Sequence, residues 1–244
     1  AYARALRDLP LASRLLSGQL PLTPAPATAL YDPPAKTPAS GVAAAAPSSI
    51  SSRLRALIEK AEHEILLISP YFIPSPDGIG VLQAATRRGV RVRTLTNSLA
   101  TTDVPVVHAG YARLRPELLA FGAELYEMRP DELPHPRRHW VPDISNARLH
   151  TKAIVVDRRH LMVGSMNLDP RSRHVNTEVA ALIDSPLLGT SLGALFDEAV
   201  QPARAYRVML SAGKAASNAL VWTAEDAGTV VRHENEPASL SRRL

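Results

Sequence analysis

Apolar and polar positions recur with two different periods along the chain from residue 48 onward. Apolar residues at helical spacing predict a helix capped by Ser48 or Ser49, followed by a buried strand at 64–69. The apolar stripe of that helix consists of Ile50, Leu54, Leu57, Ile58 and Ala61. Further helices are expected near 80–88, near 107–121 with an interruption or kink at Pro116, and at 187–200. Further strands are expected at 90–97, 123–128, 149–157, 161–164 and 178–183. Strands that alternate with helices indicate an α/β sandwich.

Both ends of the chain and one internal stretch lack this periodicity. Eight of the 21 prolines fall in the first 50 residues, among Ala, Ser and Thr, and only 2–16 has the spacing of a short helix. Residues 129–147 predict a long irregular loop, and 219–231 predict a hairpin. We therefore expect a Pro/Ala-rich linker or arm at 1–47, a globular half at 48–210, and a C-terminal hairpin and tail at 211–244.

Composition narrows the chemistry that the chain can perform. With 45% hydrophobic residues among 244, it can build a core, which excludes disorder of the whole chain. No run approaches the roughly 18 apolar residues of a membrane-spanning helix, and no charged and then apolar leader opens the sequence, so we expect neither feature. The sequence has no Cys, which excludes disulfides, thiolate zinc sites and thiol nucleophiles. The chemistry must come from His, Lys and carboxylates.

The charge of the chain adds a further clue. Its 28 Lys and Arg against 23 Asp and Glu give a net charge of +5, which is modest, and we find no surface of interleaved aromatic and basic residues for nucleic acid. Only four of the basic residues are Lys, so a Lys within a motif is informative.

One predicted strand carries a spaced group of reactive residues in the pattern HxKxxxxD, namely His150, Lys152 and Asp157. Because side chains alternate along a strand, His150 and Lys152 are expected on one face, about 6.6 Å apart. An imidazole can attack phosphorus or transfer a proton near neutral pH, and an ammonium group neutralises the oxygens of a phosphoryl transition state. Asp157 opens a polar turn, so we assign it a structural role in capping backbone amides or in a local pair.

A second polar group follows on the returning strand. Gly164 allows the backbone to approach a ligand closely, and Ser165 and Asn167 can donate hydrogen bonds to phosphate oxygens. Glu178 begins the next predicted strand, where its carboxylate could bind the ring nitrogen of His150 that does not react. As alternatives, the Ser and Asn could form an ordinary turn, and the Glu could be a surface carboxylate.

Three further features are candidates for contact with a substrate or a surface. Tyr71 follows the strand at 64–69, near the end where α/β sites open, and suits either a lipid-lining role or plain packing. Arg171 lies beside the second polar group and could contact another phosphate or cap the following segment. A basic trio in the irregular loop could attract an anionic headgroup or a membrane surface, or be solvated; it consists of Arg137, Arg138 and His139.

The segment RLHTKAIVVDRRHLMVGSMNLDPRSRHVNTEVAALIDSP, at 148–186, resembles the second half-motif of the phospholipase D superfamily, which is HxKxxxxD followed by GSxN and a later Glu. Residues 66–128 resemble, more narrowly, the C-terminal half of bacterial cardiolipin synthases of the C type. The resemblance implies a phospholipase D-like α/β/α sandwich, a mixed sheet flanked by helices. It also implies catalysis through a phosphohistidine intermediate, with no metal and no other cofactor.

The same resemblance implies a role for each residue that matches the motif. His150 matches the catalytic histidine, Lys152 the phosphate-binding lysine and Asp157 the structural aspartate. Ser165 and Asn167 match the phosphate-binding pair, and Glu178 matches the carboxylate behind the histidine. The resemblance also makes a polar loop after the strand at 90–97 a candidate wall of the substrate pocket; it contains Asn97, Ser98, Asp103 and His108.

The chain departs from the superfamily in one respect. The superfamily builds its active site from two such histidines, one as nucleophile and one as acid for the leaving alcohol, whereas this chain has one HxKxxxxD. We therefore expect a single half of a two-half enzyme, completed by a missing N-terminal half or by a second subunit. The family tendency favours the acid and base role for His150.

The expected function is that of a phosphatidyltransferase, similar to cardiolipin synthase, that acts on phospholipid phosphodiesters. Two alternatives stay open: a phospholipase D-like hydrolase or nuclease that works as a dimer, and a catalytically incomplete lipid-binding half. The expected partners are anionic or zwitterionic phospholipids and a membrane surface, and no nucleic acid. The expected location is bacterial and peripheral to the inner membrane.

Overall fold

The centre of the molecule is a ten-stranded mixed sheet in the order β1-β7-β6-β5-β2-β3-β4-β8-β9-β10. The structure, a computed structural model, describes residues 10–20, 22–33, 49–130, 149–211 and 219–239. The strands are β1 Ala27–Tyr31, β2 Glu64–Ile68, β3 Arg91–Asn97, β4 Glu124–Met128, β5 Ala153–Val156, β6 His160–Gly164, β7 Val179–Asp184, β8 Ala205–Leu210, β9 Leu220–Asp226 and β10 Thr229–His233. Strands β2, β3 and β4 are parallel neighbours, and the other pairs are antiparallel.

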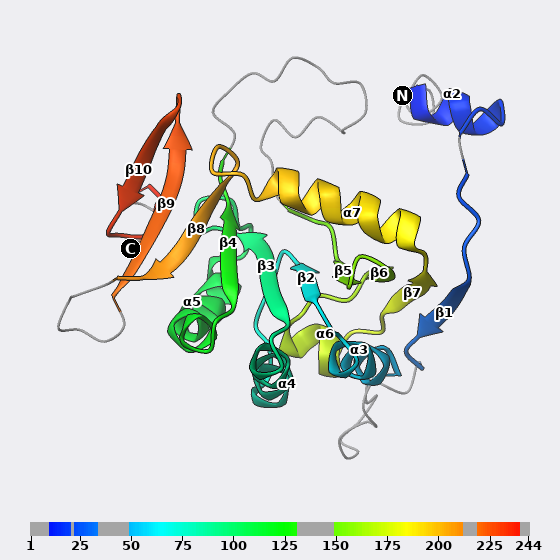
Figure 1. The fold of residues 1–244 in the computed structure, drawn as a ribbon, viewed down its shortest axis with the longest axis horizontal. Coiled ribbons are helices and arrows are strands. Elements are labelled where there is room, and N and C mark those ends of the chain that lie inside the picture. The colour runs from blue at the N-terminus through cyan, green and yellow to red at the C-terminus, as the bar shows by residue number, and fades with distance from the viewer. Residues whose placement is uncertain (1–9, 21, 34–48, 131–148, 212–218, 240–244) are drawn as a thin grey trace.

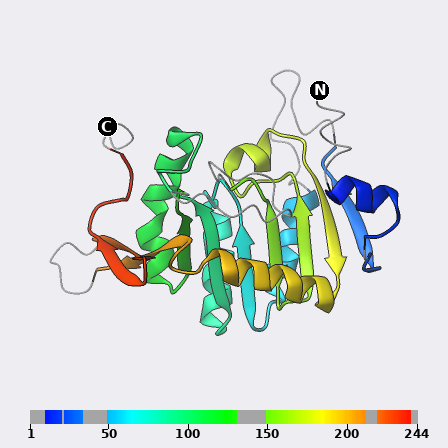
Figure 2. The same cartoon turned by 90° about the horizontal axis from the view of Figure 1, so that it is seen from above.

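Helices cover both faces of this sheet (Figure 1, Figure 2). The helices of the described residues are α2 Pro10–Leu16, α3 Ser49–Glu59, α4 Pro76–Arg87, α5 Pro105–Ala120, α6 Pro170–His174 and α7 Pro186–Ala199, of which α2 lies apart from the sheet, before β1. Helices α3, α4 and α5 lie on one face, and α7 lies on the other, across β2, β5 and β6. The expected α/β/α sandwich with a mixed sheet is confirmed.

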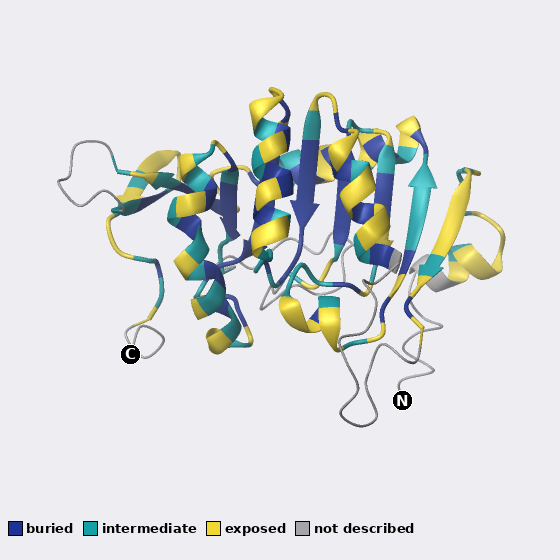
Figure 3. Cartoon of the chain, turned by 90° about the horizontal axis from the view of Figure 1, so that it is seen from below, coloured by how far each residue is buried: buried dark blue, intermediate teal, exposed yellow. Residues whose placement is uncertain are grey.

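The central strands are buried on both faces, which explains their continuous apolar sequences (Figure 3). In β2, Ile65 and Leu67 pack into the core beneath α3 and α4, whereas Leu66 and Ile68 pack with Phe196 of α7 on the other face. This alternation between two cores follows from the period of two residues in a strand.

Two strands and several boundaries differ from the sequence predictions. The predicted arm contributes β1, which pairs with β7, and β8 had no predicted counterpart. Because β9 of the C-terminal hairpin pairs with β8, the sheet extends beyond both predicted boundaries of the globular half. β1 is short, lies at the edge of the sheet and is flanked by Pro26 and Pro33, all of which obscure a strand pattern. Helix α5 continues without interruption through Pro116.

Part of the predicted loop at 129–147, including Arg137, Arg138 and His139, lies outside the described residues. Within the described part of the chain, no helix combines the length and the apolar character that crossing a membrane requires.

Candidate active site

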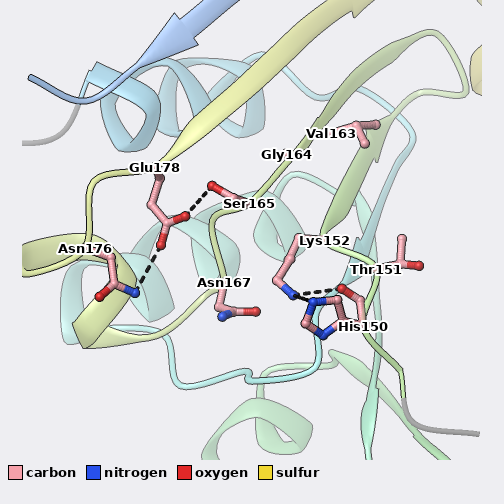
Figure 4. A pocket seen from close by; sticks show the side chains of 9 residues that line it. All are labelled: His150, Thr151, Lys152, Val163, Gly164, Ser165, Asn167, Asn176 and Glu178. Atoms are coloured by element: carbon pink, nitrogen blue, oxygen red, sulfur yellow. Dashed lines mark hydrogen bonds between the residues drawn. The ribbon is translucent and has the colours of Figure 1, made fainter. Parts of the chain in front are cut away.

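A pocket of about 490 Å³ opens at the edge of the sheet where β5 and β7 begin and β6 ends. The pocket, called the site pocket below, is lined by His150, Thr151, Lys152, Val163, Gly164, Ser165, Asn167, Asn176 and Glu178 (Figure 4). Because β5, β6 and β7 are antiparallel neighbours, the residues before β5, after β6 and before β7 meet at this edge. The parallel strands β2 and β3 end there too, as in other α/β sites.

His150 and Lys152 converge on one wall of the site pocket. Lys152 Nζ lies 3.3 Å from His150 Nε2 and donates a hydrogen bond to the His150 carbonyl oxygen at 2.8 Å. The sequence predicted both residues within a strand, but β5 begins at Ala153, and the irregular backbone before it lets the two side chains meet. His150 is exposed and Lys152 is half-buried. An entering molecule can therefore reach the imidazole while the ammonium group lies beside it.

The backbone just before His150 is held by Asn97, the last residue of β3. The Asn97 side-chain oxygen accepts from the Leu149 N–H at 2.9 Å, and its amide nitrogen donates to the Leu149 carbonyl at 3.2 Å. Thr101 Oγ1 donates to the same Asn97 oxygen at 3.2 Å. Asn97 is thus a positioning residue for His150, whereas its sequence pattern had indicated only a place in a polar loop.

The electrostatic surroundings of Lys152 are mixed. Burial lowers the pKa of Lys152 below its ordinary value of 10.5, and the negative charges of Glu178, Asp103 and Asp169 oppose this shift. A partly desolvated ammonium group interacts more strongly with an anion than one in bulk water does. The site pocket therefore offers a positive charge suited to a phosphate.

The opposite wall is a hydrogen-bonded group around Glu178 (Figure 4). Ser165 Oγ donates to the Glu178 carboxylate and accepts from the Val179 N–H at 3.0 Å, while Asn176 Nδ2 donates to the other carboxylate oxygen at 3.3 Å. Glu178 was expected to bind the ring of His150. It binds Ser165 and Asn176 instead, because the start of β7 lies beside the end of β6 and not beside β5.

Asn167 brings an unsatisfied polar atom to the site pocket. Its Oδ1 is buried and has no hydrogen-bond partner among the described residues. Leaving such an atom unpaired costs about 1 to 3 kcal/mol, and rotating the amide by half a turn would present a donor to an anion. Asn167 is therefore placed to bind a polar ligand. In the part of the chain that the structure describes, no three His, Cys, Asp or Glu side chains are grouped to hold a metal ion.

Residues 54–200 match the family model described as "Cardiolipin synthase, PLD-like domain". The chain belongs to this family. The match covers the helices α4 to α7 and the strands β2 to β7 that build the site pocket. The phospholipase D-like domain thus contains every residue of that pocket.

Two bacterial relatives support this assignment. Cardiolipin synthase C of Escherichia coli is 38% identical over 197 residues, which cover 80% of this chain and 41% of the relative. Cardiolipin synthase A of Klebsiella pneumoniae is 29% identical over 144 residues, which cover 59% of this chain and 26% of the relative. The chain therefore spans less than half the length of these relatives.

Solved structures support the fold of the phospholipase D-like domain. Nuc of Salmonella typhimurium, a phospholipase D family member, superposes with a TM-score of 0.50 at 21% identity, covering 71% of this chain and 92% of Nuc. Phosphatidylserine synthase of Haemophilus influenzae Rd KW20 gives a TM-score of 0.54 at 16% identity, covering 74% of this chain and 39% of the synthase.

Asp157 lies at the other end of β5, away from the site pocket. Its carboxylate accepts from the backbone N–H groups of Glu62, His63 and Glu64 at 3.0, 2.8 and 2.9 Å. Burial acts against the charged form, but these three donors outweigh it and lower the pKa of Asp157. The contacts agree with the structural role and tie the β5–β6 turn to the start of β2 within the phospholipase D-like domain.

We expect Asp157→Asn to lower the free energy of unfolding by about 2 kcal/mol at pH 7, because a neutral amide accepts these bonds more weakly. A lowered folded pKa means that the ionised carboxylate stabilises the fold above its ordinary pKa of 3.8 and loses this effect as the pH falls through the folded value. Urea unfolding should therefore show a difference between the two proteins that shrinks in acid. Asp184→Asn, which removes an exposed pair with Arg159, is the control and should change stability far less.

Tyr71 and Arg171 lie just outside the lining of the site pocket. The Tyr71 hydroxyl donates to Asp103 at 2.8 Å, and the charge of Asp103 acts on Lys152. Arg171 Nε donates to Asn176 Oδ1 at 3.3 Å, and Asn176 in turn binds Glu178. Both candidates therefore support residues of the pocket instead of lining it.

Ser98 and His108, expected in the pocket wall, are used in the interior of the phospholipase D-like domain. Ser98 is fully buried, and its hydroxyl lies 3.2 Å from that of Thr101 in the turn after β3. His108 is buried in α5, with Nε2 2.5 Å from Glu236 and 2.6 Å from Arg115. Buried polar groups need partners, and these two find theirs within the fold.

Two residues near the site pocket carried no sequence signal of their own. Asn176 binds the Glu178 carboxylate, as described above. Asp32, from the predicted arm, accepts from the Glu178 N–H at 3.2 Å and donates its own N–H to the Glu178 carbonyl at 2.9 Å. The proximity of Asp32 to Glu178 depends on the pairing of β1 with β7, which the pattern of the chain did not indicate.

Proposed function

We propose that this domain is half of a bacterial phosphatidyltransferase that transfers a phosphatidyl group between phospholipids, as in cardiolipin synthesis. The observation that carries the proposal is the pairing of His150 and Lys152, with Nε2 and Nζ 3.3 Å apart, in a pocket whose lining also includes Asn167, the Oδ1 of which has no partner among the described residues. A phosphodiester fits this arrangement because it needs one proton-transferring or nucleophilic group and several donors to its oxygens.

The reaction divides into two displacements at phosphorus. An imidazole nitrogen attacks the phosphodiester, the bond from phosphorus to the leaving glycerol oxygen breaks, and that oxygen takes a proton from an acid. An acceptor alcohol then gives its proton to the same group and displaces the imidazole from phosphorus. We assign the acid and base role to His150, the neutralisation of the phosphoryl oxygens to Lys152, and a hydrogen bond to one of these oxygens to the Asn167 amide N–H.

The second imidazole comes from outside this chain. A single HxKxxxxD is present in the sequence, and two displacements through a phosphohistidine need both a nucleophile and an acid. Either another part of a longer protein or a second subunit supplies it. Because the proposed substrates are phospholipids, we expect the completed enzyme to act at a membrane surface, peripheral to the bacterial inner membrane.

The test uses vesicles of phosphatidylglycerol labelled in the phosphate. The chain is assayed alone and together with a polypeptide that supplies the other half, for which the remaining part of the Escherichia coli cardiolipin synthase C is a concrete choice. We expect labelled cardiolipin and free glycerol from the mixture. Phosphatidic acid without cardiolipin would indicate a hydrolase, and no product from any combination would indicate a catalytically incomplete lipid-binding half.

Lys152 gives the site a predictable pH dependence. The protonated ammonium group attracts a phosphodiester, so affinity should fall as the pH rises through the Lys152 pKa, which burial lowers. Calorimetric titration with glycerophosphoglycerol, whose single negative charge is constant from pH 8 to 11, measures this loss. In Lys152→Arg the loss should disappear from this range, because guanidinium stays protonated there. An unchanged pH profile in that variant would remove Lys152 from the anion site.

A further inference from the structure

A second hollow of about 350 Å³ lies between α3 and α4, beside the site pocket, and is called the α3–α4 groove below. Its walls are mainly apolar and include Leu54, Ile58, Leu67, Phe72, Val81 and Leu82. The volume and the apolar lining are typical of a small-molecule site. The reaction at His150 and Lys152 assigns no use to it.

The α3–α4 groove adjoins the site pocket. Asn167 lines both of them. A small cavity of about 10 Å³ lies between them: Lys152 and Gly164 line both this cavity and the site pocket, and Met166 and Leu168 line both this cavity and the groove. The flexible thioether of Met166 therefore stands where the two spaces meet.

The charged residues around the α3–α4 groove already have partners. Arg55 pairs with Glu59 at 2.8 Å, and Arg173 lies 3.7 Å from Asp77. Asp169 accepts from the Ser172 N–H at 2.9 Å as the cap of α6. The groove thus offers apolar surface next to a pocket that holds the Lys152 ammonium group, which suits a ligand whose apolar chain is attached to a phosphate.

We propose that the α3–α4 groove takes one acyl chain of the phospholipid whose phosphate binds at His150 and Lys152. This inference rests on the proposed function, because it needs a phosphate in the site pocket to direct the chain. It adds a determinant of substrate choice that the motif residues do not provide. A groove filled instead by another segment of the chain or by a partner protein would not respond to the length of a bound alkyl chain.

The test measures binding of monomeric alkyl phosphates with four to ten carbons, and of inorganic phosphate, to the full chain. Each methylene that enters the groove should tighten binding about three- to fourfold, until the groove is full. Inorganic phosphate should bind the site pocket alone and should lose affinity in Lys152→Met.

Two glycines of α4 provide a matched pair of variants. Gly78 lines the α3–α4 groove, and a Cβ there meets Pro74 and Ser75 at 3.4 and 3.5 Å, which is ordinary contact. Gly80 lies on the same helix, is exposed, and a Cβ there meets nothing within 4 Å. We expect Gly78→Leu to weaken decyl phosphate binding about tenfold or more and to leave inorganic phosphate unchanged, whereas Gly80→Leu behaves as the wild type.

The outcomes separate the two proposals. Two results would refute acyl-chain binding in the groove and leave the proposed function intact. In one, phosphate binding depends on Lys152 but affinity does not rise with the length of the alkyl chain. In the other, affinity rises with chain length in Gly78→Leu as much as in the wild type. Absence of phosphate binding would overturn the proposed function itself. If Gly78→Leu does not fold, an alkyl phosphate with a terminal diazirine on the unaltered chain decides the matter: crosslinks in α3 or α4 support the groove, and crosslinks only elsewhere refute it.

Discussion

His150→Ala is expected to lower phosphatidyl transfer about a thousandfold in the completed enzyme, because positioned acid and base catalysis contributes a factor of this order. In the proposed reaction, the exposed imidazole of His150 transfers the proton at the site pocket. The rate of labelled cardiolipin formation measures the loss. His160→Ala changes a histidine at the opposite end of the β5–β6 hairpin, near Asp184, and should retain full activity.

A substrate with a better leaving group separates the two roles of an imidazole. With a phosphatidyl ester of p-nitrophenol, the leaving oxygen needs no proton, so His150→Ala should still release p-nitrophenol rapidly if His150 is the acid. If His150 is the nucleophile, release should be abolished with this substrate as well. Label that stays on protein after quenching in alkaline detergent, where phosphorus–nitrogen bonds survive, shows which half carries the intermediate. Undiminished transfer by His150→Ala with the natural substrate would exclude both roles.

Gly164→Ala is expected to lower the free energy of unfolding by about 3 kcal/mol or more. A Cβ at this position would lie 2.2 Å from the Val179 carbonyl oxygen and 2.7 Å from the Ala180 Cα, and both are backbone atoms of β7 that cannot turn aside. The sequence pattern suggested that this glycine makes room for a ligand. The structure shows that it also makes room for the neighbouring strand.

Thermal unfolding measures this effect and should show a melting temperature about 10 °C lower. The same change should disturb the contact between Ser165 and Glu178 and so reduce activity below what unfolding alone explains. Gly80→Ala, in open space on α4, is the control and should be neutral or slightly stabilising. A Gly164→Ala protein with the melting temperature of the wild type would show that β6 and β7 can separate without loss.

The motif residues show what local sequence can and cannot predict about the site. The sequence predicted that His150 and Lys152 would lie at the same sheet edge as Ser165 and Asn167. This arrangement could be predicted because it depends only on the hairpin of β5 and β6, whose residues are neighbours in the chain. The contact of Glu178 depends on which strand lies beside β7. That order is set by packing across the whole sheet, and the motif does not encode it.

The fold shows the same division between local and distant causes. Apolar runs such as β2 and the stripe of α3 carry their own pattern, whereas the helix predicted near 80–88 begins earlier, at Pro76 after its cap Ser75. The edge strand β1 and the late strand β8 gain their structure from the strands beside them. The resemblance to the phospholipase D superfamily assigned the loop with Ser98 and His108 to the pocket wall, but it does not reveal whether each of these side chains turns outward or inward.

The pairing of β1 with β7 has a practical consequence for producing this protein. The family match begins at residue 54. Strand β1 lies before that residue in the chain, and five residue pairs join it to β7. A polypeptide that starts at residue 54 and keeps the C-terminal strands would expose the open edge of β7, next to Glu178, and such edges recruit strands from other molecules. Aggregation of a truncated sample would therefore reflect a lost neighbour strand, and extending it to include residues 27–33 should restore a monodisperse protein.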